Sequence, residues 1–216
     1  MIIEPMKNRV AFLLLVLFPV FATLKAQNFE GIIEFKKQTG TEVVNYLYYV
    51  KGDKVRIDEF TPGTRTVSGS FIVDTKASSM IFLSPDRKLW GTRSPKGAAA
   101  APAGAVASTT KATKTLFGYK CSEQVVTHAA DSTQISYWIA PGKFYFFLPM
   151  LKLLNRQENF STYYFALAVK EGGMPLLAVE KDLNGNEKSR LEVTRLEQKA
   201  LTEGLFEIPK DYTEVK

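Results

Sequence analysis

From residue 28 onward, apolar and polar side chains alternate along short runs that are separated by turn-forming residues. Phe29, Gly31, Ile33 and Phe35 fall on one face of a first expected strand. A period of two with frequent turns is typical of antiparallel sheet. Six strands are therefore predicted before residue 94, the other five at residues 44–50, 55–58, 71–74, 80–83 and 88–92.

The same alternation resumes in the second half of the chain. One strand is expected over residues 115–127 and another over 134–139, with residues 128–131 as their connection. Near the end, Asn184-Gly185 separates two alternating runs, at 176–182 and 188–196. An Asn-Gly pair in that position is a strong hairpin signal, so a hairpin is predicted there.

Residues 144–154 depart from this pattern because they are almost wholly apolar. Pro149 suits the first turn of a helix, and Met150, Leu153 and Leu154 follow at helical spacing. A short helix is therefore predicted on the concave face of the sheet. Three interpretations stay open: a core-filling cover for that face, a movable lid over an apolar ligand cavity, or contact with a membrane.

Residues 94–115 are rich in Ala, Pro, Gly, Ser and Thr and contain no acidic or aromatic side chain. Such a composition offers little apolar surface to bury against the entropy of ordering the chain. The segment is therefore predicted to be a long disordered loop within one β-rich domain, residues 27–216. A boundary between two domains is the alternative.

The N-terminus has the three parts of a secretory signal peptide. Lys7 and Arg9 precede the apolar run 10–21, and small residues lead to Ala26. The run is 12 residues long, whereas a membrane-spanning helix needs about 20. Residues 1–26 are therefore predicted to be cleaved, with an uncleaved anchor as the alternative. The mature protein would be periplasmic or secreted, without a stable membrane span and, lacking a cysteine at the cut, without a lipid anchor.

Charge argues against one class of partner, and the cysteine content excludes an internal disulfide. The net charge of +6 falls to +4 without residues 1–26, and the basic residues are scattered, which argues against binding to nucleic acid. Cys121 is the one cysteine of the sequence, so no internal disulfide can form in the exported chain. We expect it to be a small buried side chain in a strand.

The sequence carries no recognisable catalytic or metal-binding pattern. His128 is the single histidine and Cys121 the single cysteine, which together are too few ligands for a His/Cys zinc site. Asp58 and Glu59 are adjacent, so their side chains point to opposite faces of a strand. His128, Asp131 and Ser132 share one short loop, which is unfavourable for a catalytic triad. A protein that is not an enzyme and that needs no cofactor or metal is therefore expected.

Several short motifs together resemble the DUF4412 family of exported bacterial proteins. They are Phe29-Glu30-Gly31-Ile32-Ile33, Gly118-Tyr119-Lys120-Cys121, the Tyr137-Trp138 pair, Gly173-Met174-Pro175-Leu176 and the terminal run 205–212. The resemblance implies a fold similar to the lipoprotein carriers LolA and LolB. That fold is mainly β: a curved antiparallel sheet, or incomplete barrel, with one or two short helices on its concave face. No catalytic residues come with it.

The carrier resemblance implies reversible binding of a lipid, a lipidated protein or another apolar ligand between sheet and helix. A carrier needs a cavity of roughly several hundred Å³. The alternative is an envelope protein-interaction or sensor domain with a filled core and an exposed apolar patch. The candidate lining residues share the apolar faces of the strands and of the helical segment: Tyr46, Tyr48, Phe71, Phe147, Leu151 and Leu154.

Overall fold

The computed structural model describes residues 28–94 and 97–215, and the signal peptide predicted at 1–26 lies outside this part of the chain. Twelve strands of the described residues form one sheet in the order β12-β6-β5-β4-β3-β2-β1-β11-β10-β9-β8-β7. The strands are β1 (Gly31–Thr39), β2 (Glu42–Lys51), β3 (Lys54–Phe60), β4 (Val67–Asp74), β5 (Ser79–Ser84), β6 (Leu89–Arg93), β7 (Val106–Leu116), β8 (Tyr119–His128), β9 (Thr133–Ala140), β10 (Met174–Lys181), β11 (Glu187–Gln198) and β12 (Thr213–Glu214).

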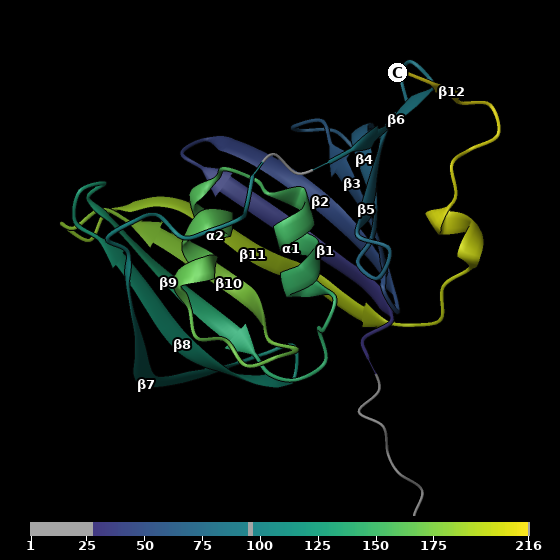
Figure 1. Cartoon of the computed structure of the whole chain (residues 1–216). Helices are drawn as coiled ribbons and strands as arrows, with labels where there is room; N and C mark the ends of the chain where they lie inside the picture. The colour runs from purple at the N-terminus through teal and green to yellow at the C-terminus, as the bar shows by residue number, and fades with distance from the viewer. Residues whose placement is uncertain (1–27, 95–96, 216) are drawn as a thin grey trace, which may run out of the picture.

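Two runs of neighbouring antiparallel strands, β1 to β6 and β7 to β11, join where β1 pairs with β11. The sheet curves strongly but does not close, since β7 lies at one end of the order and β12 at the other. Its concave side is covered by α1 (Phe147–Leu154), α2 (Asn159–Thr162) and the 3-10 turn η1 (Tyr163–Ala166) (Figure 1). The predicted fold class, a curved open sheet with short helices on the concave face, is confirmed.

Most predicted elements occur where the alternation placed them. All six early strands are present, and β10 and β11 form the predicted hairpin. Gly185 lies in its turn with φ of +91°, a conformation that glycine adopts without steric cost. The predicted helix begins two residues before Pro149, which therefore lies in its first turn.

The prediction of disorder over residues 94–115 is wrong for residues 106–115. Val106–Leu116 forms β7, an edge strand that pairs with β8, while residues 97–105 contain neither helix nor strand. The low apolar content of β7 did not prevent folding, because the strand gains main-chain hydrogen bonds along one side. Its four threonines also suit an extended backbone. Strands from both sides of the segment belong to one sheet.

The single strand predicted over 115–127 is also wrong. The chain turns at Phe117 and Gly118, whose φ values are +49° and +79°, and β8 begins at Tyr119. Two consecutive residues with positive φ are typical of a tight hairpin turn. His128 is the last residue of β8 rather than part of a connection.

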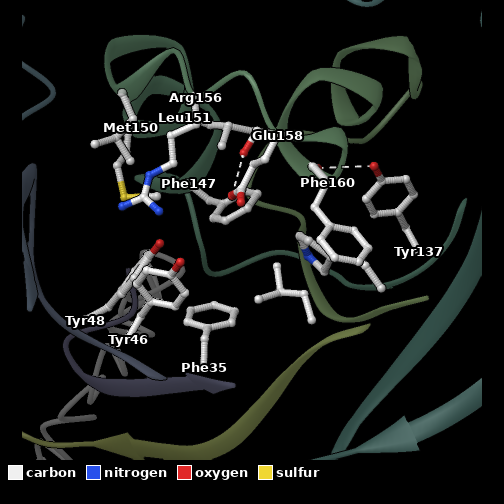
Figure 2. A pocket seen from close by; sticks show the side chains of 15 residues that line it. Phe35, Tyr46, Tyr48, Tyr137, Phe147, Met150, Leu151, Arg156, Glu158 and Phe160 are labelled. Atoms are coloured by element: carbon white, nitrogen blue, oxygen red, sulfur yellow. Dashed lines mark hydrogen bonds between the residues drawn. The ribbon is translucent and has the colours of Figure 1, made fainter. Parts of the chain in front are cut away.

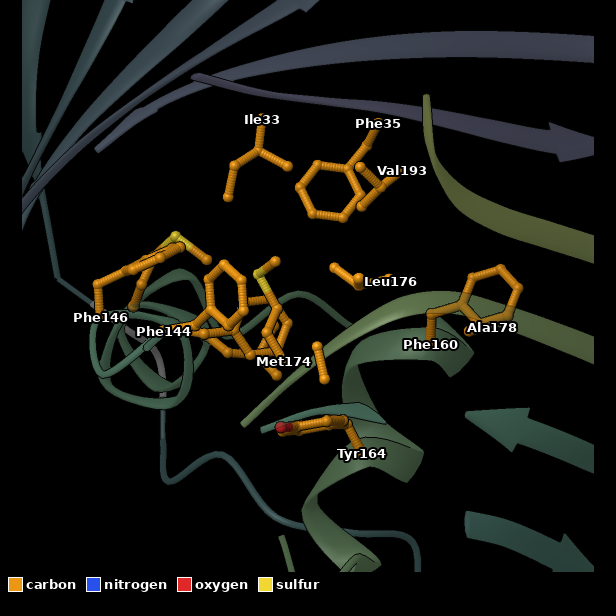
Figure 3. Close-up of a cluster of buried hydrophobic side chains, with 14 of the residues drawn as sticks. Ile33, Phe35, Phe144, Phe146, Phe160, Tyr164, Met174, Leu176, Ala178 and Val193 are labelled. Atoms are coloured by element: carbon orange, nitrogen blue, oxygen red, sulfur yellow. The ribbon is translucent and has the colours of Figure 1, made fainter. Parts of the chain in front are cut away.

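The main core lies between the concave face and the helices (Figure 3). Ile33 and Phe35 of β1 contribute from the sheet, as the alternation predicted, and Phe144, Phe146 and Phe160 contribute from the segment that covers it. Cys121 is fully buried in β8, as expected, and burial raises the pKa of its thiol. The core is therefore built mainly from large aromatic and aliphatic side chains.

The convex face carries a second, smaller core that the alternation did not predict. Ile32, Ile72 and Leu83 point outward from the sheet and are covered by Leu201 and Phe206 of the C-terminal segment. This segment leaves β11, runs along the outside of the sheet and ends beside β6, where β12 pairs in parallel (Figure 1). Because both faces are covered there, neighbouring residues such as Ile32 and Ile33 are both buried.

Candidate functional site

A small cavity of about 40 Å³ lies where α1 and the start of α2 face the sheet (Figure 2). Its lining comes from several strands and from the helical segment, so residues far apart in the sequence meet here. From the sheet come Phe35, Tyr46, Tyr48, Tyr137, Pro175, Ala178 and Leu191, and from the helical segment Phe147, Met150, Leu151, Leu154, Arg156, Glu158, Phe160 and Ser161.

The amphipathic pattern of α1 fixes which side faces the cavity. Phe147, Met150 and Leu151 are buried, whereas Leu148 is 38% exposed on the opposite side. Burying each of the three side chains contributes roughly 1.5–3 kcal/mol. The helix ends at Leu154, and Asn155 after it takes the left-handed conformation and donates its backbone N–H to the carbonyl of Leu151.

The hydrogen bonds that attach this region to the rest of the fold come from residues before and after α1 in the chain. Before the helix, the backbone N–H of Phe144 donates to the carbonyl of Gly172 at 2.9 Å. After it, Lys37 Nζ donates to Glu158 Oε2 at 2.5 Å. Within the described part of the chain, no side-chain hydrogen bond or ion pair joins α1 itself to the sheet. Among the described residues, the contacts of α1 with the sheet are apolar, and the segments before and after the helix are hydrogen-bonded to the rest of the fold.

The start of α2 is tied more firmly to the sheet. Asn159 Nδ2 donates to Glu180 Oε1 at 2.7 Å, and Ser189 Oγ donates to Glu180 Oε2 at 2.8 Å. Tyr137 Oη donates to the carbonyl of Phe160 at 3.2 Å (Figure 2). These contacts place α2 as a fixed wall of the cavity.

Arg156 brings a positive charge into this largely apolar site. Its side chain is 21% exposed, and its guanidinium lies 5.1 Å from the ring centre of Tyr46 and 6.0 Å from that of Phe71. The carboxylate of Glu59 lies 4.0 Å away, the limit of an ion pair. Figure 2 shows the hydroxyls of Tyr46 and Tyr48 directed toward this guanidinium.

The two tyrosines remain neutral over a wide pH range. Burial raises the pKa of Tyr46 to about 12 and that of Tyr48 to about 12, and the nearby Arg156 opposes the shift in both cases. Both hydroxyls are protonated at neutral pH, as in any tyrosine, and burial keeps them protonated further into the alkaline range. Together with Arg156 they form a cluster of donors at one end of an apolar cavity.

The structure brings the sequence-predicted site residues together. Tyr46, Tyr48, Phe147, Leu151 and Leu154 all line the cavity, and the sixth, Phe71, lies beside it under the Arg156 guanidinium.

Phe35, Tyr137 and Arg156 belong to this site although the sequence pattern did not assign them to it. Phe35 and Tyr137 could have been found, since each lies on the apolar face of a predicted strand. Arg156 belongs to the polar exit of the helical segment, and nothing in the local pattern shows that its side chain turns back toward the sheet.

The cavity is much smaller than the several hundred Å³ that a carrier needs. A volume of about 40 Å³ has room for a few water molecules at most and for no acyl chain. In this conformation, aromatic side chains and the residues of α1 fill the concave face.

His128 has polar contacts at both ring nitrogens. Its Nδ1 lies 2.9 Å from Asp131 Oδ2 and 3.2 Å from the hydroxyl of Tyr163. Its Nε2 lies 2.9 Å from the carbonyl oxygen of Ala103. The group joins β8 to η1 and to the segment before β7.

The described residues offer neither a metal site nor a membrane-spanning helix. Residues 28–94 and 97–215 contain no group of three His, Cys, Asp or Glu side chains that could hold a metal ion. No helix in that part of the chain is long and apolar enough to cross a membrane.

Comparison with known proteins identifies a family but no activity. The model of the family described as "Domain of unknown function (DUF4412)" matches residues 29–212. No functionally curated protein matches the sequence.

Solved structures share a distant likeness with the chain. An uncharacterized conserved protein from Thermus thermophilus is 13% identical with a TM-score of 0.47, covering 86% of this chain and 90% of that one. PNGF-II is 13% identical with a TM-score of 0.43, and the match covers 85% of this chain but 30% of that one. A domain ascribed to an outer membrane lipoprotein-sorting protein of Vibrio parahaemolyticus is 9% identical with a TM-score of 0.33, covering 84% and 89%. Similarity at this level does not extend to function.

Proposed function

Because the chain belongs to the DUF4412 family, whose function is unknown, we propose its role from the site itself: it is an exported, non-catalytic binder of an acyl chain. The chain would lie between the concave face of the sheet and α1. The observation that carries this proposal is the apolar, largely aromatic lining shared by the sheet and α1, with a donor cluster at one end.

Binding requires α1 to move, since the closed cavity of about 40 Å³ has no room for a chain. Its attachment supports such movement, because its contacts with the sheet are apolar within residues 28–94 and 97–215, while the segments on both sides are hydrogen-bonded to the rest of the molecule. α1 would then act as a lid between Phe144 and Glu158.

The free-energy cost of lifting α1 and the gain from burying an acyl chain are of comparable size. Lifting α1 exposes Phe147, Met150 and Leu151, at a cost of roughly 1.5–3 kcal/mol each. A bound chain returns about 0.8 kcal/mol per buried CH₂ group. A chain of about twelve carbons therefore offsets the opening, whereas one of about six carbons does not.

A second candidate function is a protein-interaction or sensor domain of the cell envelope with a filled core. The closed concave face favours it, since a cavity of about 40 Å³ is close to solid packing. In that case the sheet and helices form one rigid unit, and partners would bind elsewhere on the surface. Ligand titration separates the two candidates.

The test is native mass spectrometry of the chain purified from a bacterial periplasm. We expect a co-purifying acyl species of one copy per protein, or one added dodecanoate per protein together with no binding of hexanoate. A protein that neither co-purifies with an acyl species nor binds dodecanoate would contradict the proposal and favour the filled-core alternative.

A further inference from the structure

The position of Arg156 says more about the ligand than the apolar walls do. A guanidinium in a largely apolar site is costly to bury unless an anion or several acceptors compensate it. Arg156 is 21% exposed and faces ring surfaces of Tyr46 and Phe71. The ring faces attract the positive charge but accept no hydrogen bonds from the guanidinium N–H groups in its plane. Those N–H groups match the two oxygens of a carboxylate or phosphate.

The carboxylates near Arg156 leave capacity for another anion. Glu158 lies two residues further along the chain but is engaged by Lys37 at 2.5 Å and by Ser161 at 3.3 Å. Glu59 lies 4.0 Å from Arg156, and its side chain is 39% exposed. Glu59 can therefore turn into solvent when a closer anion arrives.

The two tyrosines complete the same donor cluster. Figure 2 shows the hydroxyls of Tyr46 and Tyr48 directed at the Arg156 guanidinium from β2, while Leu151 and Met150 approach from α1. Both hydroxyls are protonated at neutral pH, as those of ordinary tyrosines are. Charged and neutral donors thus converge at the point where the apolar lining begins.

We propose that the ligand is an anionic amphiphile, and that Arg156, Tyr46 and Tyr48 bind its carboxylate or phosphate head while α1 covers its chain. This inference rests on the proposed acyl-chain binding and adds the charge of the ligand. Glu59 is the competing anion, which the ligand head displaces.

The experiment compares probes that share one chain and differ in the head group: dodecanoate, dodecyl phosphate and uncharged dodecanol. Affinities are measured by titration calorimetry on the whole chain as purified, below the micelle concentration of the two anions and below the solubility limit of dodecanol. Wild-type protein is expected to bind at least one of the two anions about 10- to 100-fold more tightly than dodecanol, the size expected of charge-assisted hydrogen bonds. The stronger of the two anions shows whether a carboxylate or a phosphate is the preferred head.

Two variants assign the effect to the donor cluster. Arg156→Gln removes the guanidinium charge, so it is expected to abolish most of the preference for the anion. The affinity for uncharged dodecanol is expected to change less than about threefold. Glu59→Gln is expected to tighten anion binding several-fold, because the competing carboxylate is gone. If Arg156→Gln fails to fold, Glu59→Gln still tests the role of the donor cluster. Glu59 is partly exposed, so this variant is expected to fold.

Failure of this inference differs from failure of the proposed function. Equal affinity of wild-type protein for dodecanoate, dodecyl phosphate and dodecanol would overturn the role of Arg156 and leave acyl-chain binding standing. No effect of Glu59→Gln on anion binding would also overturn it. Absence of binding by all three probes would overturn both.

Discussion

Gly31, the first residue of β1, is a position that tolerates no side chain. Its φ is +151°, and a Cβ placed on its backbone would lie 2.0 Å from the carbonyl oxygen of Glu197 on the neighbouring strand. β1 is also the strand that joins the two halves of the sheet through β11. Close approach of the two backbones therefore depends on glycine at this residue.

Gly31→Ala is expected to lower the free energy of unfolding by more than about 2 kcal/mol, because β1 and β11 must separate locally. Gly40→Ala is the matched control: Gly40 also has a positive φ, but a Cβ at Gly40 would meet nothing within 4 Å, so only about 1 kcal/mol is expected. Urea unfolding measures both. Equal losses in the two variants would contradict the account of the close contact.

Residue-level patterns predicted much of the candidate site. Alternation assigned Tyr46 and Tyr48 to one face of a strand, and helical spacing assigned Leu154 to the same interior. The side chain of Arg156 could not be placed in this way, because its direction is set by the backbone after α1 and by rings from β2 and β4. Tertiary contacts therefore set the direction of the Arg156 side chain.

At the level of elements, α1 is stabilised by packing rather than by local structure. It has 8 residues, no acidic side chain in its first turn and no side-chain cap. Isolated helices shorter than about 12 residues are marginal in water. The helix therefore exists because its apolar side faces the sheet.

Met150→Ala is expected to destabilise the protein by about 2–5 kcal/mol, since Met150 is fully buried on the sheet side of α1 and its loss leaves a void. Leu148→Ala on the same helix is the control, with an expected change below about 0.5 kcal/mol, because Leu148 is exposed. Thermal or urea unfolding gives both values. A large loss in the Leu148 variant would mean that the helix faces differ from those described.

Hydrogen exchange is expected to show α1 opening before the sheet does. The helix lacks polar contacts to the strands among the described residues, whereas the amides of β1 are bonded on both sides, to β2 and β11. Amides of α1 should therefore exchange faster than those of β1 under native conditions, and bound dodecanoate should slow them. Exchange of α1 at the same slow rate as β1 would contradict its role as a lid.

Element prediction from sequence succeeded where side chains are buried and failed where they are not. Strands β1 to β6 were visible because apolar residues alternate along them. β7 was missed because its Ser, Thr, Ala and Lys side chains are mostly exposed and its stability comes from main-chain pairing with β8. Composition carries no information about such a pairing.

The whole molecule is a curved sheet with a separate apolar cluster on each side. The inner cluster, under the helices, includes several tyrosines whose pKa values burial raises. The outer cluster depends on the C-terminal segment, whose Leu201 and Phe206 are buried. The sequence pattern predicted the sheet, but it did not predict the outer layer, since that contact joins residues about 170 positions apart, as in the bond from Leu201 N–H to Glu30 Oε1.

The buried tyrosines make stability fall in alkaline solution. Tyr46 and Tyr48 have pKa values of about 12 when folded and an ordinary value of 10.0 when exposed. Between those values the unfolded chain releases protons that the folded chain keeps, so the free energy of unfolding decreases as pH rises. Each tyrosine contributes a slope of roughly 1.4 kcal/mol per pH unit.

Urea unfolding at pH 9, 10 and 11 measures this slope as the change in the free energy of unfolding with pH. Tyr48→Phe is expected to reduce the loss above pH 10 by about the contribution of one tyrosine, and Tyr145→Phe, at an exposed position, serves as the control. Stability that stays constant from pH 9 to 11 would contradict the burial of these hydroxyls.

The most direct test of acyl-chain binding under α1 is an NMR measurement of contacts between the ligand and methyl-labelled methionine and leucine. With dodecanoate bound, we expect nuclear Overhauser effects from ligand methylene groups to the buried methyls of Met150 and Leu151, and none to exposed Leu148. Contacts to Leu148 without contacts to Met150 and Leu151, or no contacts at all at saturating dodecanoate, would contradict acyl-chain binding under α1.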